Sequence, residues 1–520
     1  MIKKYISIFS AALLLCAGTV SCIGDLDVTP IDPTITLPDD VLDSEDAYAS
    51  LLAKCYAGLT VSASEGPDGG ADIDGIDGGY GQYLRALFYM NEYTTDEAVC
   101  PWNDQTLYNI HGLSWTTSDV FVTAMFSRIY YQIGLCNEFL RRSKSSSFRD
   151  SQTMKTYEAE ARALRALSYL HAIDMFGNVP FATEANSVGS TGPDRISRAN
   201  LFKWLDKECD EMLAGSDLKE IGANVYGRLD KGFVMMIQAK LNLNAAVYLG
   251  ISDAEAKEYF NKAGTLCKDI KAKYPALHET VEIDGNSYHE LFMADNDKWN
   301  AKEIIFCVPQ DGNNIQSYGG TTFLIKAAIK SGEPEWMAAM GVNDGWGGIN
   351  VTPEFIKLFG STDLADFKDF TSGWSAYKFS NLRSDGQPAQ AVNFPDTDFP
   401  LFRTADAYLM LAEAQLRGAS TVTEAEGRDA WTKVRKRAGI GEVTNYNLDE
   451  LLNERGRELY WECWRRSDLV RFGKFTSKDY LWAWKGGVYE GTGVDEKFNL
   501  MPIPANEINS NDKLIQNPGY

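Results

Sequence analysis

Apolar side chains recur at steps of three and four residues in several separate stretches of this chain, and glycine ends most of them. This spacing places the apolar side chains on one face of an α-helix, and glycine after the last of them is a normal C-terminal signal. The stripes run over residues 47–59, 159–173, 233–245, 405–416 and 452–463. Their many alanines allow helices to approach closely. We therefore expect a mainly α fold of stacked helix pairs, as in tetratricopeptide arrays, although no 34-residue repeat is visible.

Two of these stretches also carry signals at their ends. Gly177 and Pro180 follow the stripe at 159–173. Since proline cannot continue a helix, these two residues indicate a C-terminal end. Asn447 precedes the stripe at 452–463, and Glu450 three residues later completes a capping pattern. The sequence thus predicts a helix that stops at Gly177 and another that begins after Asn447 and extends to Cys463.

Long irregular regions separate the helical stretches and contain many aromatic residues. They cover residues 62–80, 284–320, 332–350 and 482–498. Loops of this length inside a folded protein are usually functional or mobile. The chain has 12 Trp, 25 Tyr and 25 Phe, and several of these rings stand beside glycines in loops: Trp102, Tyr318, Trp346, Trp374, Trp482 and Trp484. Such rings can stack on the apolar face of a sugar, and they can equally be core residues, so both interpretations stay open here.

The N-terminus has the pattern of a processing segment. Lys3 and Lys4 precede a compact apolar run at residues 8–17, which is too short to span a bilayer. Small residues then lead to Cys22, as in a bacterial lipobox. We predict a signal peptide over residues 1–21 and acylation of Cys22, which would anchor the protein to a membrane. An ordinary secretory signal that happens to contain Cys22 is the alternative.

The charge of the chain limits its partners. Lys and Arg number 50 against 72 Asp and Glu, so the net charge is −22, and the leader contains two of the lysines. The predicted mature chain therefore carries a net charge of −24. Nucleic-acid binding depends on Lys and Arg that neutralise phosphates, so this balance argues against it. It also argues against broad electrostatic docking on anionic lipid.

The sequence contains none of the common catalytic, metal-binding or nucleotide-binding motifs. No C-x-x-C, G-x-S-x-G, H-E-x-x-H, P-loop or dinucleotide motif is present. The acidic stretch at residues 72–78 fails the EF-hand pattern, since its fifth position is isoleucine. Carboxylates are so frequent that no glycosidase pair stands out. The sequence gives no positive case for an enzyme or for a catalytic cofactor.

Distinctive motifs along nearly the whole chain resemble the SusD/RagB family. They lie at residues 21–33, 161–167, 176–180, 227–231, 291–297, 377–386, 408–414, 465–473 and 502–520. The run Arg465-Arg466-Ser467-Asp468-Leu469-Val470-Arg471-Phe472-Gly473 is the most specific of them. The resemblance implies one glycan-binding unit over residues 22–520. Four tetratricopeptide-like helix pairs would carry an inserted loop-rich region at about 280–400.

The resemblance also implies a function and a location. Members of the family are outer-membrane lipoproteins that face the cell exterior and cap a SusC-like TonB-dependent transporter. They bind their cargo without chemical change. The closest likeness is to starch-binding members, so we expect starch or a related α-glucan. The alternatives are another glycan, a peptide cargo or, from a different class, a glycoside hydrolase.

Site residues follow from local matches to the starch-binding members, in which a glucan helix lies on an arc of rings. Trp102, Tyr318 and Trp346 match the arc, Arg85 matches one polar contact, and Asn103 or Gln105 matches another. A further arc tryptophan of those members is Cys100 here, so one side of the arc is thinner. The resemblance also implies a structural calcium ion, for which Asp297, Asp396 and Asp398 match the acidic segments.

Overall fold

A computed structural model describes residues 41–186, 192–274, 277–278, 288–360, 367–370 and 373–520. The chain divides between residues 47 and 48, and residues 48–520 form the larger, compact unit. The predicted signal peptide and Cys22 lie outside the described residues. The account below concerns the larger unit.

Helices dominate this unit and the strands are short. The α-helices are α3 (Glu45–Ala57), α4 (Tyr83–Asn91), α5 (Gln105–His111), α6 (Val120–Ser145), α7 (Gln152–Met175), α8 (Arg198–Ala214), α9 (Lys231–Leu243), α10 (Ala245–Leu249), α11 (Lys257–Lys273), α12 (Gly320–Ala328), α13 (Pro334–Ala339), α14 (Pro353–Ile356), α15 (Thr404–Leu416), α16 (Glu424–Arg437), α17 (Leu448–Leu459), α18 (Arg465–Arg471) and α19 (Ala505–Ser510). The strands are β1 (Ala98–Val99), β2 (Val179–Pro180), β3 (Arg195–Ile196), β4 (Ile304–Val308), β5 (Asn350–Val351), β6 (Phe367–Phe370), β7 (Gly373–Ala376) and β8 (Phe399–Arg403).

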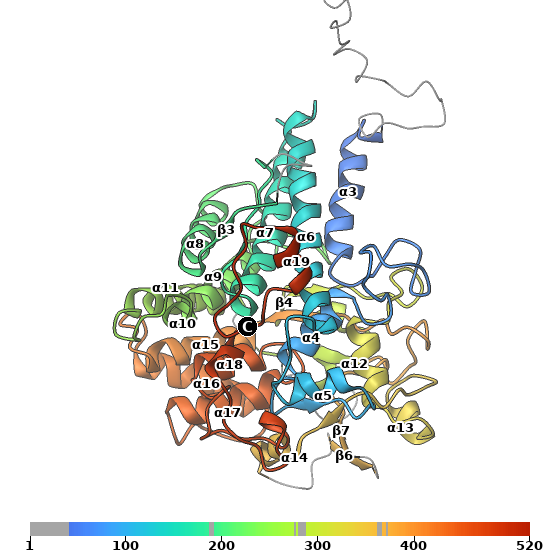
Figure 1. Cartoon of the computed structure of the whole chain (residues 1–520), viewed down its shortest axis with the longest axis vertical. Coiled ribbons are helices and arrows are strands. Elements are labelled where there is room, and N and C mark those ends of the chain that lie inside the picture. The colour runs from blue at the N-terminus through green and yellow to red at the C-terminus, as the bar shows by residue number, and fades with distance from the viewer. Residues whose placement is uncertain (1–40, 187–191, 275–276, 279–287, 361–366, 371–372) are drawn as a thin grey trace, which may run out of the picture. The chain divides into compact units, whose positions relative to one another are not determined.

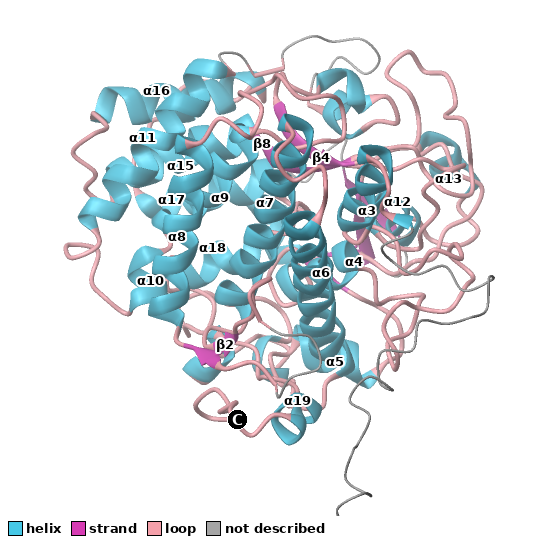
Figure 2. Ribbon diagram, turned by 90° about the horizontal axis from the view of Figure 1, so that it is seen from above, coloured by secondary structure: helices cyan, strands magenta, loops and turns pink. Residues whose placement is uncertain are grey.

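The long helices pack against one another in a continuous row. In this row α6 packs on α7, α7 on α8, α8 on α9, α9 on α11, α11 on α15, and α15 on α16 and α17. Figures 1 and 2 show α8, α11, α15 and α16 on one side of the unit, and α12 and α13 among long loops on the other. The predicted mainly α fold with paired helices is confirmed.

Most of the predicted helix ends are also confirmed. Gly177 and Gly418 each adopt positive φ just after α7 and α15, a conformation that costs glycine little. The predicted single helix from the stripe at 233–245 to Gly250 is wrong, because the helix is interrupted at Asn244 and Gly250 ends the separate α10. Asn447 caps α17 by accepting a hydrogen bond from the backbone N–H of Glu450. The predicted extension of this helix to Cys463 is wrong, because α17 ends at Leu459 and the chain then turns sharply.

The loop-rich part contains small antiparallel sheets that the sequence analysis did not predict. The strand β4 pairs with β8, and a second sheet has the order β1-β5-β7-β6. Ala98 lies opposite Val351 in the β1–β5 pair, and Val99 lies opposite Asn350. This pairing fixes the segment that follows β1 beside the segment that precedes β5. These two segments carry Trp102 and Trp346.

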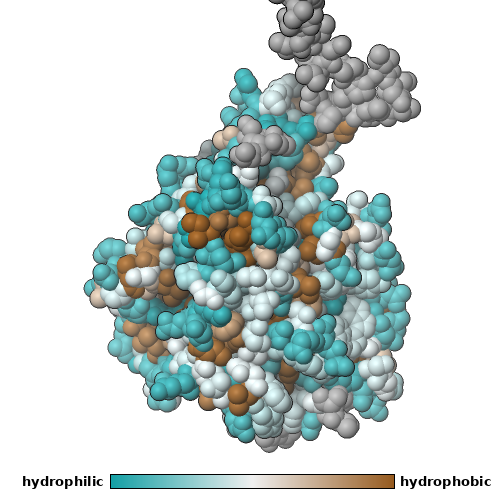
Figure 3. All heavy atoms as spheres, viewed as in Figure 1, coloured by the Kyte–Doolittle hydropathy of each residue, from teal (hydrophilic) through white to brown (hydrophobic). Residues whose placement is uncertain are grey.

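The surface and the core differ in composition as expected for a folded globular unit. On the side of the molecule seen in Figure 3, apolar residues form separate small patches among hydrophilic ones. The seven cysteines from Cys55 to Cys463 are buried free thiols. This agrees with the odd number of cysteines and with their scattered positions in the sequence.

Candidate functional site

Trp102 and Trp346 lie in direct contact beside the β1–β5 pair. The indole Nε1 of Trp102 donates a hydrogen bond to the backbone oxygen of Trp346 over 3.0 Å. Gly348 makes room for the Trp102 ring, since a Cβ at this position would lie 2.6 Å from the ring atom Cζ2. Both tryptophans are half-buried, so part of each ring stays open to solvent.

Tyr318 completes the group from the turn that precedes α12. Its ring centroid lies 6.0 Å from that of Trp346, and the two ring planes meet at 64°. Its hydroxyl donates a 2.7 Å hydrogen bond to Oδ1 of Asp68 in the 62–80 loop, and this bond raises the pKa of the tyrosine. We call Trp102, Tyr318 and Trp346 the ring cluster. The structure thus brings together the three rings that the family resemblance predicted.

Arg85 lies beneath the ring cluster and is buried, with 7% of its surface exposed. Its guanidinium donates to the backbone oxygens of Tyr318, over 3.1 Å, and of Gly79. The carbon Cζ lies 4.3 Å from the ring centroid of Phe323 and 6.0 Å from that of Trp102. The hydrogen bonds of Arg85 also join the 62–80 loop to the segment of Tyr318. The polar contact to the ligand that the resemblance implies for Arg85 stays a prediction.

Trp346 is held by an ion pair as well as by its backbone. Its indole Nε1 donates to Oδ2 of Asp344 over 3.1 Å, and the other oxygen of Asp344 pairs with Lys326 Nζ at 2.5 Å. The ammonium of Lys326 also lies 5.7 Å from the indole centroid. These contacts fix the orientation of the ring before any ligand arrives, which lowers the entropy cost of binding.

Asn103 and Gln105 are exposed at the edge of the ring cluster, next to Trp102. Asp104 between them caps α5 by accepting a hydrogen bond from the backbone N–H of Thr106. Oδ1 of Asn103 accepts a 3.3 Å hydrogen bond from the hydroxyl of Tyr108, and Gln105 donates along the helix. Both amides are exposed next to Trp102, and the structure does not choose between them as the predicted polar contact.

Phe394 is an additional ring that the sequence analysis missed. It is half-buried, and its centroid lies 5.5 Å from that of Tyr318. Beside it, Asn393 accepts a 2.8 Å hydrogen bond from the side-chain amide of Asn343. The segment around Phe394 has no glycine pair or other local pattern. Only its aromatic character within an irregular polar stretch could have indicated it.

Two other loop tryptophans have different environments. Trp482 is fully buried and packs on Phe475, with 6.2 Å between ring centroids, so the core interpretation is correct for it. Trp484 is 51% exposed and lies edge-on to Tyr489. Neither tryptophan belongs to the ring cluster, so the location of a tryptophan in a loop does not by itself identify a site residue.

The three aspartates of the predicted calcium site lie in one neighbourhood. Asp398 is buried and accepts hydrogen bonds from the Tyr226 hydroxyl at 2.6 Å and the Gln310 backbone N–H at 2.8 Å. Burial raises its pKa to about 7, and the charge of Asp297 also raises it. Both oxygens of Asp396 accept backbone N–H groups.

These aspartates fit a cation only in part. Asp398 is buried and Asp297 is exposed, and a divalent ion between them would relieve the repulsion that raises the pKa of Asp398. Within the described ranges, however, no group of three or more His, Cys, Asp and Glu side chains gathers as a metal site would. The calcium ion stays a prediction.

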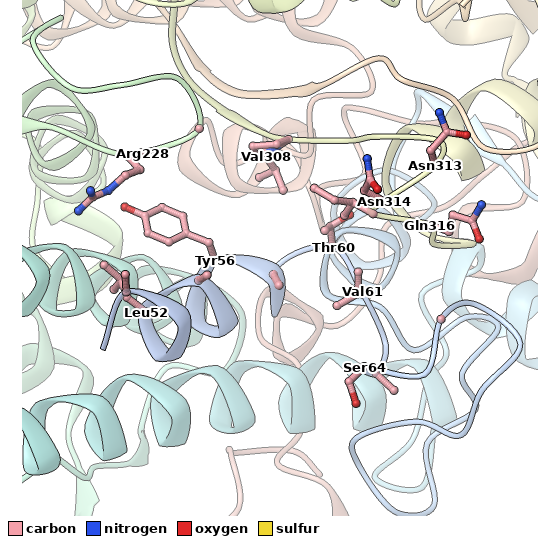
Figure 4. Close-up of a pocket in the computed structure, with 18 of the residues that line it drawn as sticks. Leu52, Tyr56, Thr60, Val61, Ser64, Arg228, Val308, Asn313, Asn314 and Gln316 are labelled. Carbon is pink, nitrogen blue, oxygen red and sulfur yellow. The ribbon is translucent and has the colours of Figure 1, made fainter. Parts of the chain in front are cut away.

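A separate pocket of about 850 Å³ opens next to α3. Figure 4 shows Tyr56 and Arg228 at one end of it and Asn313 and Gln316 at the other. We call it the α3 pocket. It is lined by Ala49, Leu52, Ala53, Tyr56, Ala57, Thr60, Val61, Ala63, Ser64, Glu65, Gly66, Tyr157, Tyr226, Gly227, Arg228, Val308, Pro309, Asn313, Asn314, Ile315 and Gln316. No member of the ring cluster lines it.

Comparison with known proteins places the chain in a family. A family model described as the SusD family matches residues 360–520. The starch-binding protein SusD of Bacteroides thetaiotaomicron is 34% identical, and the match covers 100% of both chains. The chain belongs to the SusD family.

Several solved structures share the fold. A SusD superfamily protein from Parabacteroides distasonis has a TM-score of 0.71 at 20% identity, over 92% of this chain and 100% of that one. Surface glycan-binding protein A from Bacteroides thetaiotaomicron, in complex with laminarihexaose, has a TM-score of 0.68 at 17% identity, over 91% and 99% of the two chains. At these identities the likeness concerns the fold alone. Among the described residues of this SusD-family chain, no helix is long and apolar enough to cross a membrane.

Proposed function

We propose that this protein captures starch or a related α-glucan at the cell surface and delivers it to a SusC-like TonB-dependent transporter without chemical change. The observation that carries the proposal is the convergence of the ring cluster. Trp102, Tyr318 and Trp346 come from three distant segments, and each keeps part of its ring open to solvent. The full-length similarity to a starch-binding protein supports an α-glucan as the ligand.

The expected affinity follows from the number of rings. Stacking contributes about 0.5–1.5 kcal/mol per ring pair beyond area burial, and a sugar on a ring is of the same order. Three rings supply a few kcal/mol against an association cost of at least about 4 kcal/mol. We expect short glucans to bind weakly, on the order of micromolar to millimolar. Long glucans bind better, because neighbouring turns raise the effective concentration.

The shape of the cluster favours a curved ligand. The rings of Tyr318 and Trp346 meet at 64°, so they present a bent surface instead of a flat one. A helical α-glucan matches such a surface better than a straight β-glucan of the cellulose type. The laminarihexaose complex of a fold relative makes curved β-glucans the second candidate class of ligand.

A glycan panel tests this proposal. Affinity electrophoresis of the purified protein against amylopectin, laminarin and a cellulose-type β-glucan should show the strongest retardation with amylopectin. Retardation by laminarin alone would transfer the assignment to β-glucans. Incubation with amylopectin followed by an assay for new reducing ends should show no release. Release at an enzymatic rate would establish a glycoside hydrolase instead.

The location belongs to the same proposal. Acylation at Cys22 anchors the protein in the outer membrane, facing outward, and Asp25 and Asp27 fit a surface-export signal. The protein should therefore partition with membranes and be cleaved by protease added to intact cells. If Cys22→Ala left membrane association unchanged, the lipid anchor would be wrong.

A structural calcium ion held by Asp297, Asp396 and Asp398 is also proposed. Burial and the charge of Asp297 raise the pKa of Asp398, and a bound calcium ion would favour its ionised carboxylate. Addition of calcium to chelator-treated protein should raise the melting temperature, and Asp398→Asn should remove the increase. An equal increase with magnesium would indicate unspecific stabilisation.

A further inference from the structure

The α3 pocket has the size of a small-molecule site and is kept open by small side chains. Its volume of about 850 Å³ lies within the range of ligand pockets, about 300–1,000 Å³. Ala49, Ala53 and Ala57 lie along α3 at intervals of four residues and line the pocket, and Ala63 lines it from the following loop. A larger residue at any of these positions would fill part of the space.

The lining is close to neutral. Glu65 and Arg228 are the charged residues among those that line the pocket. The charge of Arg228 is compensated, because its Nε and Nη2 atoms donate to the two carboxylate oxygens of Glu160 over 3.0 and 2.5 Å. The remaining polar groups are side-chain amides and hydroxyls: Ser64, Thr60, Asn313, Asn314 and Gln316. Such a lining does not select a charged ligand, and it offers hydrogen bonds to a neutral one.

Three tyrosines in the lining are held in fixed orientations. The hydroxyl of Tyr226 donates to Asp398 over 2.6 Å, and the hydroxyl of Tyr56 donates to Glu160 over 2.5 Å. The ring centroid of Tyr157 lies 4.9 Å from Cζ of Arg228. Rings fixed in this way lose little freedom when a ligand packs on them. Tyr226 is 46% exposed, so part of its ring is free for contact.

We propose that the α3 pocket is a second carbohydrate site, which binds a short, uncharged stretch of glucan independently of the ring cluster. Aromatic and apolar groups match the C–H faces of the sugar, and the amides match its hydroxyls. The inference rests on the proposed glycan-binding function and extends it to a second place on the molecule.

Two segments, the 62–80 loop and residues 313–318, contribute both to the α3 pocket and to the ring cluster or its contacts. Ser64 lines the pocket, and Asp68, four residues later, holds the hydroxyl of Tyr318. Gln316 lines the pocket, and Tyr318, two residues later, belongs to the ring cluster. A long glucan on the rings therefore has other parts of its chain near the pocket. The two sites together raise the retention of long glucans through effective concentration.

Binding of maltotriose tests the inference when the ring cluster is removed. The variant with Trp102→Ala, Tyr318→Ala and Trp346→Ala should still give saturation-transfer NMR signals from maltotriose. Adding Ala53→Trp, which fills the pocket from an exposed helix position, should abolish these signals. The matched control Ala53→Ser should keep them. With the rings intact, Ala53→Trp should weaken retention on amylopectin about tenfold, the effect of about 1.4 kcal/mol.

Three other outcomes would overturn the inference, and they distinguish a failure of the second site from a failure of the proposed function. If wild-type protein binds maltotriose and the ring variant does not, the protein has one glucan site and the proposed function stands without the second. If the ring variant gives signals from trialanine and none from maltotriose, the pocket takes peptides. If wild-type protein binds no glucan at all, the proposed function fails together with this inference.

Discussion

A set of charged side chains between the helices is buried and paired, whereas the ring cluster is half-exposed and held by a few hydrogen bonds. In the helical part, Arg455 bridges Asp406 and Asp468, and Arg471 bridges Asp468 and Glu413, all with side chains at most 4% exposed. In the ring cluster, Trp102 contacts Trp346 through one 3.0 Å hydrogen bond and Tyr318 contacts Asp68 through another of 2.7 Å.

This difference separates stability from binding. Removing one partner of a buried ion pair leaves an uncompensated charge and is strongly destabilising. Removing a half-exposed ring loses less buried apolar surface, so the free energy of unfolding falls less and the helix pairs stay intact. Substitutions in the two regions should therefore change different measured quantities, and the following predictions test this.

The largest effect on stability is expected for Arg465→Met. Arg465 donates to both oxygens of Asp96 over 2.8 Å, and both side chains are at most 2% exposed. Its loss leaves Asp96 buried without its countercharge, so urea unfolding should show a loss of about 3–5 kcal/mol. The control Lys436→Met removes an exposed ion pair with Glu442 and should leave the unfolding curve near wild type. Equal effects of the two substitutions would contradict the comparison.

The triple variant Trp102→Ala, Tyr318→Ala and Trp346→Ala should lose starch binding through the ring cluster. Three stacking contacts correspond to a few kcal/mol, on the order of a hundredfold or more in Kd. Calorimetric titration with a long maltooligosaccharide measures the loss, and circular dichroism should show unchanged helical content.

The exposed Trp484 supplies the control for this experiment, because Trp484→Ala should leave binding as in wild type. If the triple variant loses several kcal/mol of stability, the rings are core residues. If it stays folded and binds the long glucan as tightly as wild type, the main site lies elsewhere.

Stability should fall as the pH rises toward 8, because of a buried carboxyl pair. Burial raises the pKa of Glu97 to about 7, and the pKa of the neighbouring Glu92 is also raised. Between the unfolded pKa, about 4.3, and this value, the folded state holds a proton that the unfolded state has lost. Raising the pH through this window therefore destabilises the fold, on the order of 1–3 kcal/mol.

Urea unfolding between pH 6.5 and 7.5, where Glu97 still holds part of its proton in the folded state, measures this slope most clearly. Below pH 6.5, His171 opposes it, since burial lowers the histidine pKa to about 4 and stability rises with pH as the unfolded state loses its proton. The variant Glu97→Gln should flatten the slope above pH 6.5. An unchanged slope would assign the effect to other groups, among them Asp398.

The smallest effect is expected for Phe394→Ala. The ring of Phe394 packs beside Tyr318, so its removal should weaken glucan binding by a few-fold, the size of one stacking contact. Phe394→Tyr keeps the ring and should bind as wild type. Unchanged affinity in Phe394→Ala would mean that the glucan touches only the three predicted rings.

Helix positions could be predicted from the sequence because their causes are local. The stripe at 405–416 and Gly418 after it describe α15 and its end almost to the residue. The predicted extension of α17 to Cys463 is wrong because local sequence signals do not reveal the turn that ends this helix. Trp461 and Cys463 adopt positive φ, and the backbone N–H of Trp461 donates to Glu97, more than 360 residues away.

The ring cluster was found through family resemblance and not through spacing. Its closeness depends on β1 and β5, two-residue strands that no periodicity can reveal. The burial of Arg85 has the same origin, because its partners Tyr318 and Phe323 come from a segment more than 230 residues later. Long-range packing set these features, so they required the structure.

The buried cysteines make this molecule suitable for site-specific labelling. The thiols from Cys55 to Cys463 are all buried and therefore shielded from reagents, and burial raises the pKa of Cys100 to about 11. In a chain that lacks the first 22 residues, a cysteine introduced at Asn103 would be the thiol that a maleimide dye reaches. Its fluorescence would report glucan arrival at the rings, and the same substitution at Ser64 would report on the α3 pocket.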